Sequence, residues 1–150
     1  MRPLPEIAWI LGYAGLLPFV LLALSLLLGL ELPFLKGVRL DWWLAAYAAV
    51  VLSFLGAVHW GVVLGMQRYL PEHEVERLLV YGVAPGVLAW LGLLLPVNLS
   101  LLFMALLLVG AYVVDRMLLF PRINSQYARL RTQLTAIAVL MLVLAGFSAA

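Results

Sequence analysis

Long uncharged apolar stretches alternate with short charged segments along the chain. Four windows contain no Asp, Glu, Lys or Arg: residues 7–30, 42–67, 78–114 and 132–150. A helix needs about 20 predominantly apolar residues to cross the roughly 30 Å hydrocarbon core of a bilayer. Each window meets that requirement, so the pattern predicts helices that cross a membrane, with the charged segments at their aqueous ends.

The third window is too long for one span. At a rise of 1.5 Å per residue, its roughly 37 residues would extend about 55 Å as a single helix. We expect it to fold back at Pro-Val-Asn-Leu-Ser, residues 96–100, because proline ends a helix and Asn or Ser can cap the next one. The pattern therefore predicts one transmembrane domain over residues 1–150, with helices near 7–29, 42–66, 78–96, 99–119 and 132–149.

The composition agrees with this pattern. Of the 150 residues, 67% are hydrophobic and 11% are charged, whereas soluble domains average about 45–50% and about 25%. This predicts an all-α integral membrane bundle of five transmembrane helices, with no room for an aqueous catalytic or nucleic-acid-binding domain. The chain has no cysteine, which excludes disulfides and thiolate chemistry. The first window exceeds the about 7–15 apolar residues of a signal peptide, so we expect a retained helix.

Lysine and arginine are divided unevenly between the two ends of the predicted bundle. Lys36 and Arg39 lie at one end. The other end collects seven arginines: Arg2, Arg68, Arg77, Arg116, Arg122, Arg129 and Arg131. Because cytoplasmic loops carry an excess of basic residues, we expect a multi-pass protein of the bacterial inner (plasma) membrane, with a cytoplasmic N-terminus and a periplasmic C-terminus.

Small residues recur every four positions along the second predicted helix. They are Ala45, Ala49, Ser53, Ala57, Gly61 and Gly65. In membranes such residues let helices approach closely, and a spacing of four drifts about 40° per step around a helix of 3.6 residues per turn. We therefore expect this helix to lie centrally and to pack against more than one neighbour. The alternative is that alanine and glycine are simply abundant in membrane helices.

A few polar residues are predicted to share one depth in the cytoplasmic leaflet. Counted from the outer ends, His59 lies about 25 Å down the second helix and Asp115 about 24 Å down the fourth. Ionisable residues inside a span are functional candidates by default. We expect His59 and Asp115, backed by Arg131 or Arg116, to form a ligand site. The aromatic residues Trp60 and Tyr81 are predicted nearby.

Each candidate also has a structural explanation. Asp115 can pair with an arginine simply to anchor a helix end, and His59 can hydrogen-bond a backbone carbonyl. Trp and Tyr gather at membrane interfaces because one end of the ring prefers lipid and the other water. The sequence contains no HExxH motif, glycine-rich phosphate loop or nucleophile elbow. We therefore predict no catalytic residue, no metal ligand and no cofactor.

Several of these segments together resemble a known family. They are Gly15–Phe19 (Gly-Leu-Leu-Pro-Phe), Ser53–Gly56 (Ser-Phe-Leu-Gly) followed by His59–Gly61 (His-Trp-Gly), Pro85 with Ala89–Trp90, Asp115, and Arg131 with Leu134–Thr135. The pattern, which covers most of the chain, is similar to an uncharacterised membrane-protein family, a domain of unknown function, that includes transmembrane protein sixty-nine of animal mitochondria. The resemblance implies a five-helix membrane protein and a link to energy-converting membranes, without an established activity.

These observations leave three functions open. The small-residue ridge and the lack of catalytic groups favour a non-enzymatic accessory, assembly or interaction protein, with a membrane-protein complex or a second copy of itself as partner. The convergence of His59 and Asp115 indicates instead a binder of a lipid or quinone-like amphiphile. A proton or ion pathway is the least favoured, because the outer halves of the helices are almost entirely apolar. Membrane lipids are expected neighbours in each case, and nucleic acid is not.

Overall fold

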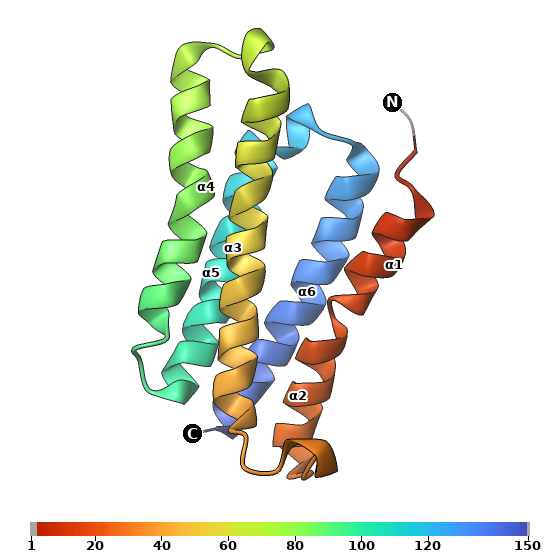
Figure 1. The fold of residues 1–150 in the computed structure, drawn as a ribbon, viewed down its shortest axis with the longest axis vertical. Helices are drawn as coiled ribbons and strands as arrows, with labels where there is room; N and C mark the ends of the chain where they lie inside the picture. Colours follow the sequence, from red (N-terminus) through yellow and green to blue (C-terminus); the bar gives the residue numbers. More distant parts are fainter. Residues whose placement is uncertain (1–2, 150) are drawn as a thin grey trace.

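Five helical spans run from one end of the molecule to the other (Figure 1). The computed structural model describes residues 3–149, which contain no strand. The spans are α1 (Glu6–Ala14) with α2 (Leu17–Leu28), α3 (Leu40–Met66), α4 (Glu72–Gly92), α5 (Val97–Leu118) and α6 (Ser125–Ser148). Each is long and apolar enough to cross a membrane. The predicted all-α bundle of five transmembrane helices is confirmed.

The two ends of the bundle differ in charge. The loops that follow α3 and α5 lie at the same end as the start of the chain, and the C-terminus lies at the other (Figure 1). The first of these, here called the arginine-rich end, carries five exposed or half-exposed arginines: Arg68, Arg77, Arg116, Arg122 and Arg129. There Arg122 forms an ion pair with Glu74 that joins the loop before α6 to the first turn of α4. Arg2 lies outside the described residues.

Two helices begin earlier than the uncharged windows indicate. α4 begins at Glu72, not near residue 78, and α6 begins at Ser125, not near residue 132. The acidic first turn of α4 suits the positive end of a helix dipole. At the start of α6 the Asn124 side chain accepts a hydrogen bond from the Gln126 amide at 2.8 Å. An uncharged window marks the part of a helix inside the membrane, whereas these helices continue into the polar interface.

The first span is interrupted in its middle. α1 ends at Ala14 and α2 begins at Leu17, just ahead of Pro18, whose missing N–H removes a helical hydrogen bond. At this point the Tyr47 hydroxyl of α3 donates a hydrogen bond to the Gly15 carbonyl at 2.6 Å. α4, in contrast, continues unbroken through Pro85. The break in the helical pattern therefore falls in the first span.

α3 lies centrally and packs against α2, α4 and α5. Its closest approach is to α4 at two facing glycines: a Cβ added to Gly56 would lie 2.0 Å from the Gly82 carbonyl oxygen. Near this point Ser53 packs against Gly86, where an added Cβ would lie 2.9 Å from the Ser53 hydroxyl. Glycine at positions 56 and 82 lets the backbones of α3 and α4 touch. Small residues stabilise helix pairs in membranes by allowing such close approach.

The predicted ridge of small residues meets α4 over only part of its length. Ala49 is half-buried, and Ser53 contacts α4 although its side chain is exposed. Ala57 is exposed. Gly61 and Gly65 are exposed, and a Cβ added to either would meet nothing within 4 Å. The drift of about 40° per step carries the ridge from the α4 contact onto the outer surface, so its last two members make no helix contact within the described chain.

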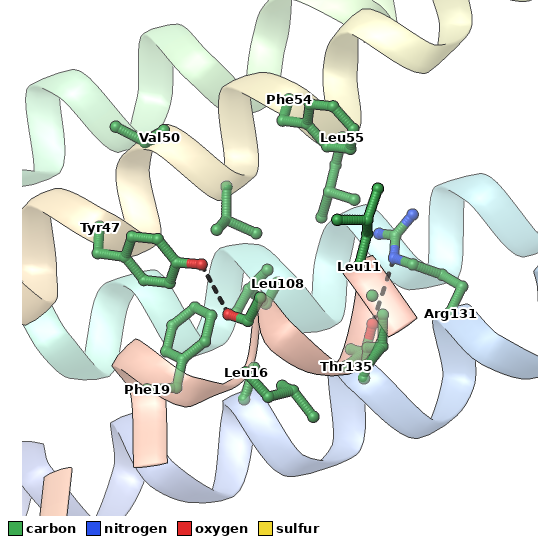
Figure 2. A pocket seen from close by; sticks show the side chains of 15 residues that line it. Leu11, Leu16, Phe19, Tyr47, Val50, Phe54, Leu55, Leu108, Arg131 and Thr135 are labelled. Atoms are coloured by element: carbon green, nitrogen blue, oxygen red, sulfur yellow. Dashed lines mark hydrogen bonds between the residues drawn. The ribbon is translucent and has the colours of Figure 1, made fainter. Parts of the chain in front are cut away.

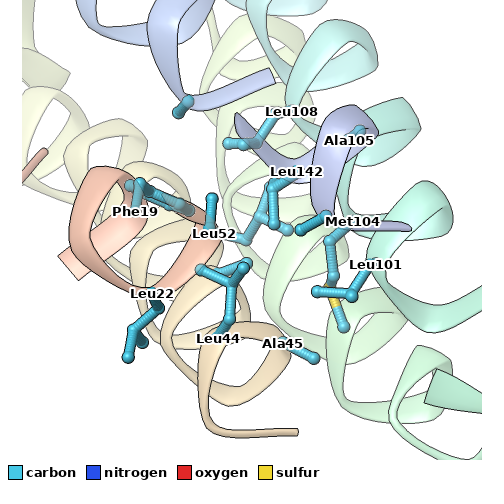
Figure 3. Close-up of a cluster of buried hydrophobic side chains, with 14 of the residues drawn as sticks. Phe19, Leu22, Leu44, Ala45, Leu52, Leu101, Met104, Ala105, Leu108 and Leu142 are labelled. Atoms are coloured by element: carbon cyan, nitrogen blue, oxygen red, sulfur yellow. The ribbon is translucent and has the colours of Figure 1, made fainter. Parts of the chain in front are cut away.

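The buried apolar core lies between α2, α3, α5 and α6 (Figure 3). Phe19 and Leu22 project from α2 towards Leu44 and Leu52 of α3, and Leu142 of α6 completes the layer. These side chains are no more than 4% exposed. The core fixes how α2, α3, α5 and α6 face one another, and so sets the position of the polar residues nearer the arginine-rich end.

Candidate functional site

Three ionisable side chains from three different helices meet inside the bundle. The Asp115 carboxylate of α5 lies between His59 of α3 and Arg131 of α6. The Arg131 Nη1 group donates a hydrogen bond to Asp115 Oδ2 at 2.6 Å. His59 Nε2 lies 2.7 Å from Asp115 Oδ1, an ion-pair distance, although the two atoms are not aligned as a hydrogen bond. The side chains are 2%, 1% and 3% exposed for His59, Asp115 and Arg131.

The three residues meet because they share one depth. Each is reached by counting 1.5 Å per residue from the helix end opposite the arginine-rich end. His59 lies about 28 Å from the start of α3, Asp115 about 27 Å from the start of α5, and Arg131 about 26 Å from the end of α6. This level is close to the hydrocarbon boundary of the leaflet at the arginine-rich end.

Opposite charges balance within this cluster. One carboxylate and one guanidinium sum to zero when the imidazole is neutral, which makes burial of both charges tolerable. On its other side, His59 Nδ1 lies 3.3 Å from the Gly56 carbonyl oxygen. His59 therefore joins the polar cluster to the glycine contact between α3 and α4. This arrangement combines both the ion-pair and the carbonyl-bonding explanations that the sequence left open.

Arg131 has two further neighbours on its own helix. Its Nε group donates a hydrogen bond to the Thr135 hydroxyl at 3.3 Å. One turn earlier, Tyr127 lies close enough for its hydroxyl to interact electrostatically with Arg131 and Asp115. No hydrogen-bond partner within the described chain reaches Arg131 Nη2. Thr135 and Tyr127 are absent from the sequence-predicted site, although their spacing of four from Arg131 on one helix could have indicated them.

A pocket of about 310 Å³ reaches from Arg131 towards the middle of the bundle between α1, α2, α3 and α6 (Figure 2). Its floor is formed by buried apolar side chains, among them Leu16, Phe19, Leu55, Leu108 and Ala138. Along α3 the lining extends eight residues, which corresponds to about 12 Å. The pocket is thus an elongated apolar space parallel to the helices.

One side of this pocket faces the surrounding lipid. Leu11, Val50 and Phe54 line it and are 64%, 65% and 69% exposed. At the other extreme, the Arg131 guanidinium and the Thr135 hydroxyl supply polar groups, and Figure 2 shows the guanidinium beside Leu11 and Leu55. The pocket therefore has a polar end and an apolar channel that opens to the bilayer.

Trp60 and Tyr81 lie away from this site, contrary to their predicted place in it. The Trp60 indole donates a hydrogen bond to the Leu79 carbonyl of α4 at 3.1 Å and covers Gly82. Tyr81 is exposed on α4. Trp60 therefore faces α4 and Tyr81 lies on the exposed surface of α4, because a shared depth does not specify the side of a helix. Within residues 3–149, no group of three His, Cys, Asp or Glu side chains could hold a metal ion.

The family described as Protein of unknown function (DUF3429) matches residues 4–147. The chain belongs to this family. It is 32% identical to Transmembrane protein 69 of Xenopus tropicalis over 145 residues. This aligned region covers 95% of this chain and 54% of that relative. The chain therefore spans about half the length of that relative. No solved structure matches. The resemblance seen in the motifs is confirmed.

Proposed function

We propose that this membrane protein binds a lipid or quinone-like amphiphile, with the head group at Arg131 and the chain in the apolar pocket. The observation that carries the proposal is the pocket itself, which joins a space open to the bilayer to a buried guanidinium with an unpartnered N–H group. Ligand pockets in proteins have this character: mostly apolar walls with a few convergent polar groups.

The size and orientation of the pocket suit such a ligand. Its volume of about 310 Å³ is at the lower end of the range of roughly 300–1,000 Å³ for small-molecule sites. It holds a head group and the first part of one chain, and the remainder can pass between Leu11 and Phe54 into the bilayer. Arg131 lies near the hydrocarbon boundary, where the head group of an amphiphile also lies.

A pocket-filling substitution tests this proposal. Val51 is half-buried and lines the pocket, so Val51→Phe should occupy the space with a ring. Val80→Phe is the matched control, because Val80 is 68% exposed on α4 and does not line the pocket. The purified proteins are exposed to a photoreactive alkyl amphiphile in dodecyl maltoside, and the labelled peptides are mapped by mass spectrometry.

The wild type and Val80→Phe should be labelled on α1, α3 and α6, and Val51→Phe should lose most of that labelling. Equal labelling of all three proteins, or labelling spread evenly over the exposed helix faces, would contradict the proposal. Thermal unfolding of each variant in the same detergent confirms that the folded protein is being compared.

An accessory or assembly role is a second candidate, favoured by the outer surface of α3. Gly61 and Gly65 leave that surface shallow, with nothing within 4 Å of an added Cβ, and small residues allow a further helix to approach closely. Gly61→Leu would then reduce the recovery of a partner subunit or a second copy in native mass spectrometry after gentle extraction. A monomer without partners in wild type and variant alike argues against this role.

A further inference from the structure

The polar groups that line the pocket differ in whether they already have a hydrogen-bond partner within the protein. The Gly15 carbonyl already accepts the Tyr47 hydroxyl at 2.6 Å, and the Thr135 hydroxyl oxygen already accepts Arg131 Nε at 3.3 Å. In contrast, no partner within the described residues meets hydrogen-bond geometry with Arg131 Nη2, although the Tyr127 hydroxyl lies close enough to the guanidinium to interact with it. The group left to recognise a ligand is therefore an N–H donor, and the matching ligand atom is an acceptor.

The charge of the head group follows from the neighbours of that donor. The Arg131 guanidinium is already balanced by the Asp115 carboxylate at 2.6 Å. With the imidazole of His59 neutral beside the same carboxylate, the buried cluster has no net charge. A carboxylate or phosphate placed at Nη2 would add a second negative charge near Asp115, where little water screens the repulsion. An uncharged acceptor makes the same hydrogen bond without this penalty.

We infer that the head group recognised at Arg131 is an uncharged carbonyl, of the kind found in quinones and in the ester groups of neutral lipids. The inference rests on the proposed function and specifies its ligand class. With the His59 imidazole neutral, the charge balance of the cluster disfavours carboxylate and phosphate amphiphiles. The two pocket acceptors each take one hydrogen bond already, which favours a ligand that offers an acceptor.

The head group, not the chain, decides affinity at this site. Lipid tails are as apolar as the pocket walls, so moving an alkyl chain from the bilayer into the pocket gains little. A hydrogen bond to a charged donor in a site shielded from water strengthens binding by about tenfold or more. Nη2 is covered in this structure, and the side chain beside it, Leu11, is 64% exposed to lipid. A ligand therefore reaches the donor only if a lining side chain moves, and Leu11 is the lining residue that Figure 2 shows beside the guanidinium.

The test compares head groups on the full chain in dodecyl maltoside, a detergent without carbonyl groups. Competition against the photoreactive probe is measured for a decyl-substituted benzoquinone, a diacylglycerol, oleate and dodecyl phosphate, an anion without an ester carbonyl. The two carbonyl compounds should compete at least about tenfold better than the two anions, since one hydrogen bond to a charged donor has that effect. Whichever of the two competes more strongly identifies the source of the carbonyl, a quinone or an ester.

Arg131→Lys provides the matched variant. Lysine keeps the positive charge for Asp115 but cannot supply Nη2, so carbonyl affinity should fall about tenfold, while competition by a decylbenzene, which has no hydrogen-bond acceptor, stays unchanged. Arg129→Lys makes the same change at an exposed arginine of α6 and should leave affinity unchanged. Unfolding midpoints show whether both variants retain the fold, and the ranking of the four compounds on the wild type does not depend on either variant.

Different results overturn different claims. If oleate or dodecyl phosphate competes as well as the carbonyl compounds, or if Arg131→Lys leaves carbonyl affinity unchanged, the assignment of the head group is wrong even though a pocket ligand exists. If none of the four compounds reduces labelling, and Val51→Phe is labelled like the wild type, the proposed function itself fails.

Discussion

Removing the charge of Asp115 should destabilise the folded protein strongly. The Asp115→Asn substitution keeps the size of the side chain but leaves the Arg131 charge uncompensated among side chains at most 3% exposed. Breaking one member of a buried ion pair costs about 3–5 kcal/mol in soluble proteins. In a bilayer the unfolded helices also keep these groups near lipid, which reduces the difference, so we expect about 3 kcal/mol.

A double-mutant cycle separates the ion pair from the general cost of substitution. Asp115→Asn and Arg131→Gln are measured singly and together by reversible unfolding in mixed micelles. The double variant carries no uncompensated charge, and its two amides can hydrogen-bond each other. It should therefore be less destabilised than the sum of the single variants, with an interaction energy of about 2 kcal/mol, within the range for residues in direct contact.

The ion pair of Glu74 and Arg122 is the matched control. It joins the same types of group at the arginine-rich end, but its side chains are 29% and 24% exposed. Exposed pairs contribute about 0–1 kcal/mol, so Glu74→Gln should lower stability by at most about 1 kcal/mol. Additive effects at Asp115 and Arg131, or an equal cost at Glu74, would refute the claim that the buried pair supports the helix arrangement.

Three further predictions concern the helices and their orientation. Gly56→Ala should cost about 1–3 kcal/mol of unfolding free energy, because its Cβ would meet a backbone carbonyl of α4 at 2.0 Å; Gly61→Ala on the same helix should cost nothing, since its added Cβ meets nothing within 4 Å. Asn124→Ala should cost about 1 kcal/mol and speed hydrogen exchange in the first turn of α6, and unchanged exchange there would contradict the capping role. In the cysteine-free chain, cysteines introduced at Lys36 and Arg122 should react from opposite sides of the membrane, and labelling of both from one side would refute the topology.

Much of the fold could be predicted because the bilayer imposes simple length rules. The uncharged windows located five spans. The fold-back in the third window lies at residues 93–96, ahead of the predicted 96–100: α4 ends at Gly92, Pro96 precedes α5, and residues 97–100 form its first turn. Helix starts at Glu72 and Ser125 were missed, because helices that continue into the interface need no apolar residues there. The uncharged windows predict which part of a helix lies inside the membrane. They do not predict where the hydrogen bonds of the helix begin or end.

The site could be predicted in depth but not in direction. Counting residues placed His59 and Asp115 at one level, and the structure brings them together with Arg131. The same count included Trp60, which faces α4 instead, and Tyr81, which lies on the exposed surface of α4. The pocket depends on how α1 and α2 lie against α3 and α6, and that contact joins residues more than 30 positions apart, such as Gly15 and Tyr47. No local pattern contains this information.

The interruption of the first span couples the effects of substitutions at Pro18 and Tyr47. A backbone carbonyl without a donor inside a bilayer costs several kcal/mol, and at Gly15 the donor is a phenol on another helix. Loss of that phenol would thus be harmful with Pro18 in place, and much less so in a chain whose first span was one regular helix. The residues at 18 and 47 therefore constrain each other's replacement although they belong to different spans.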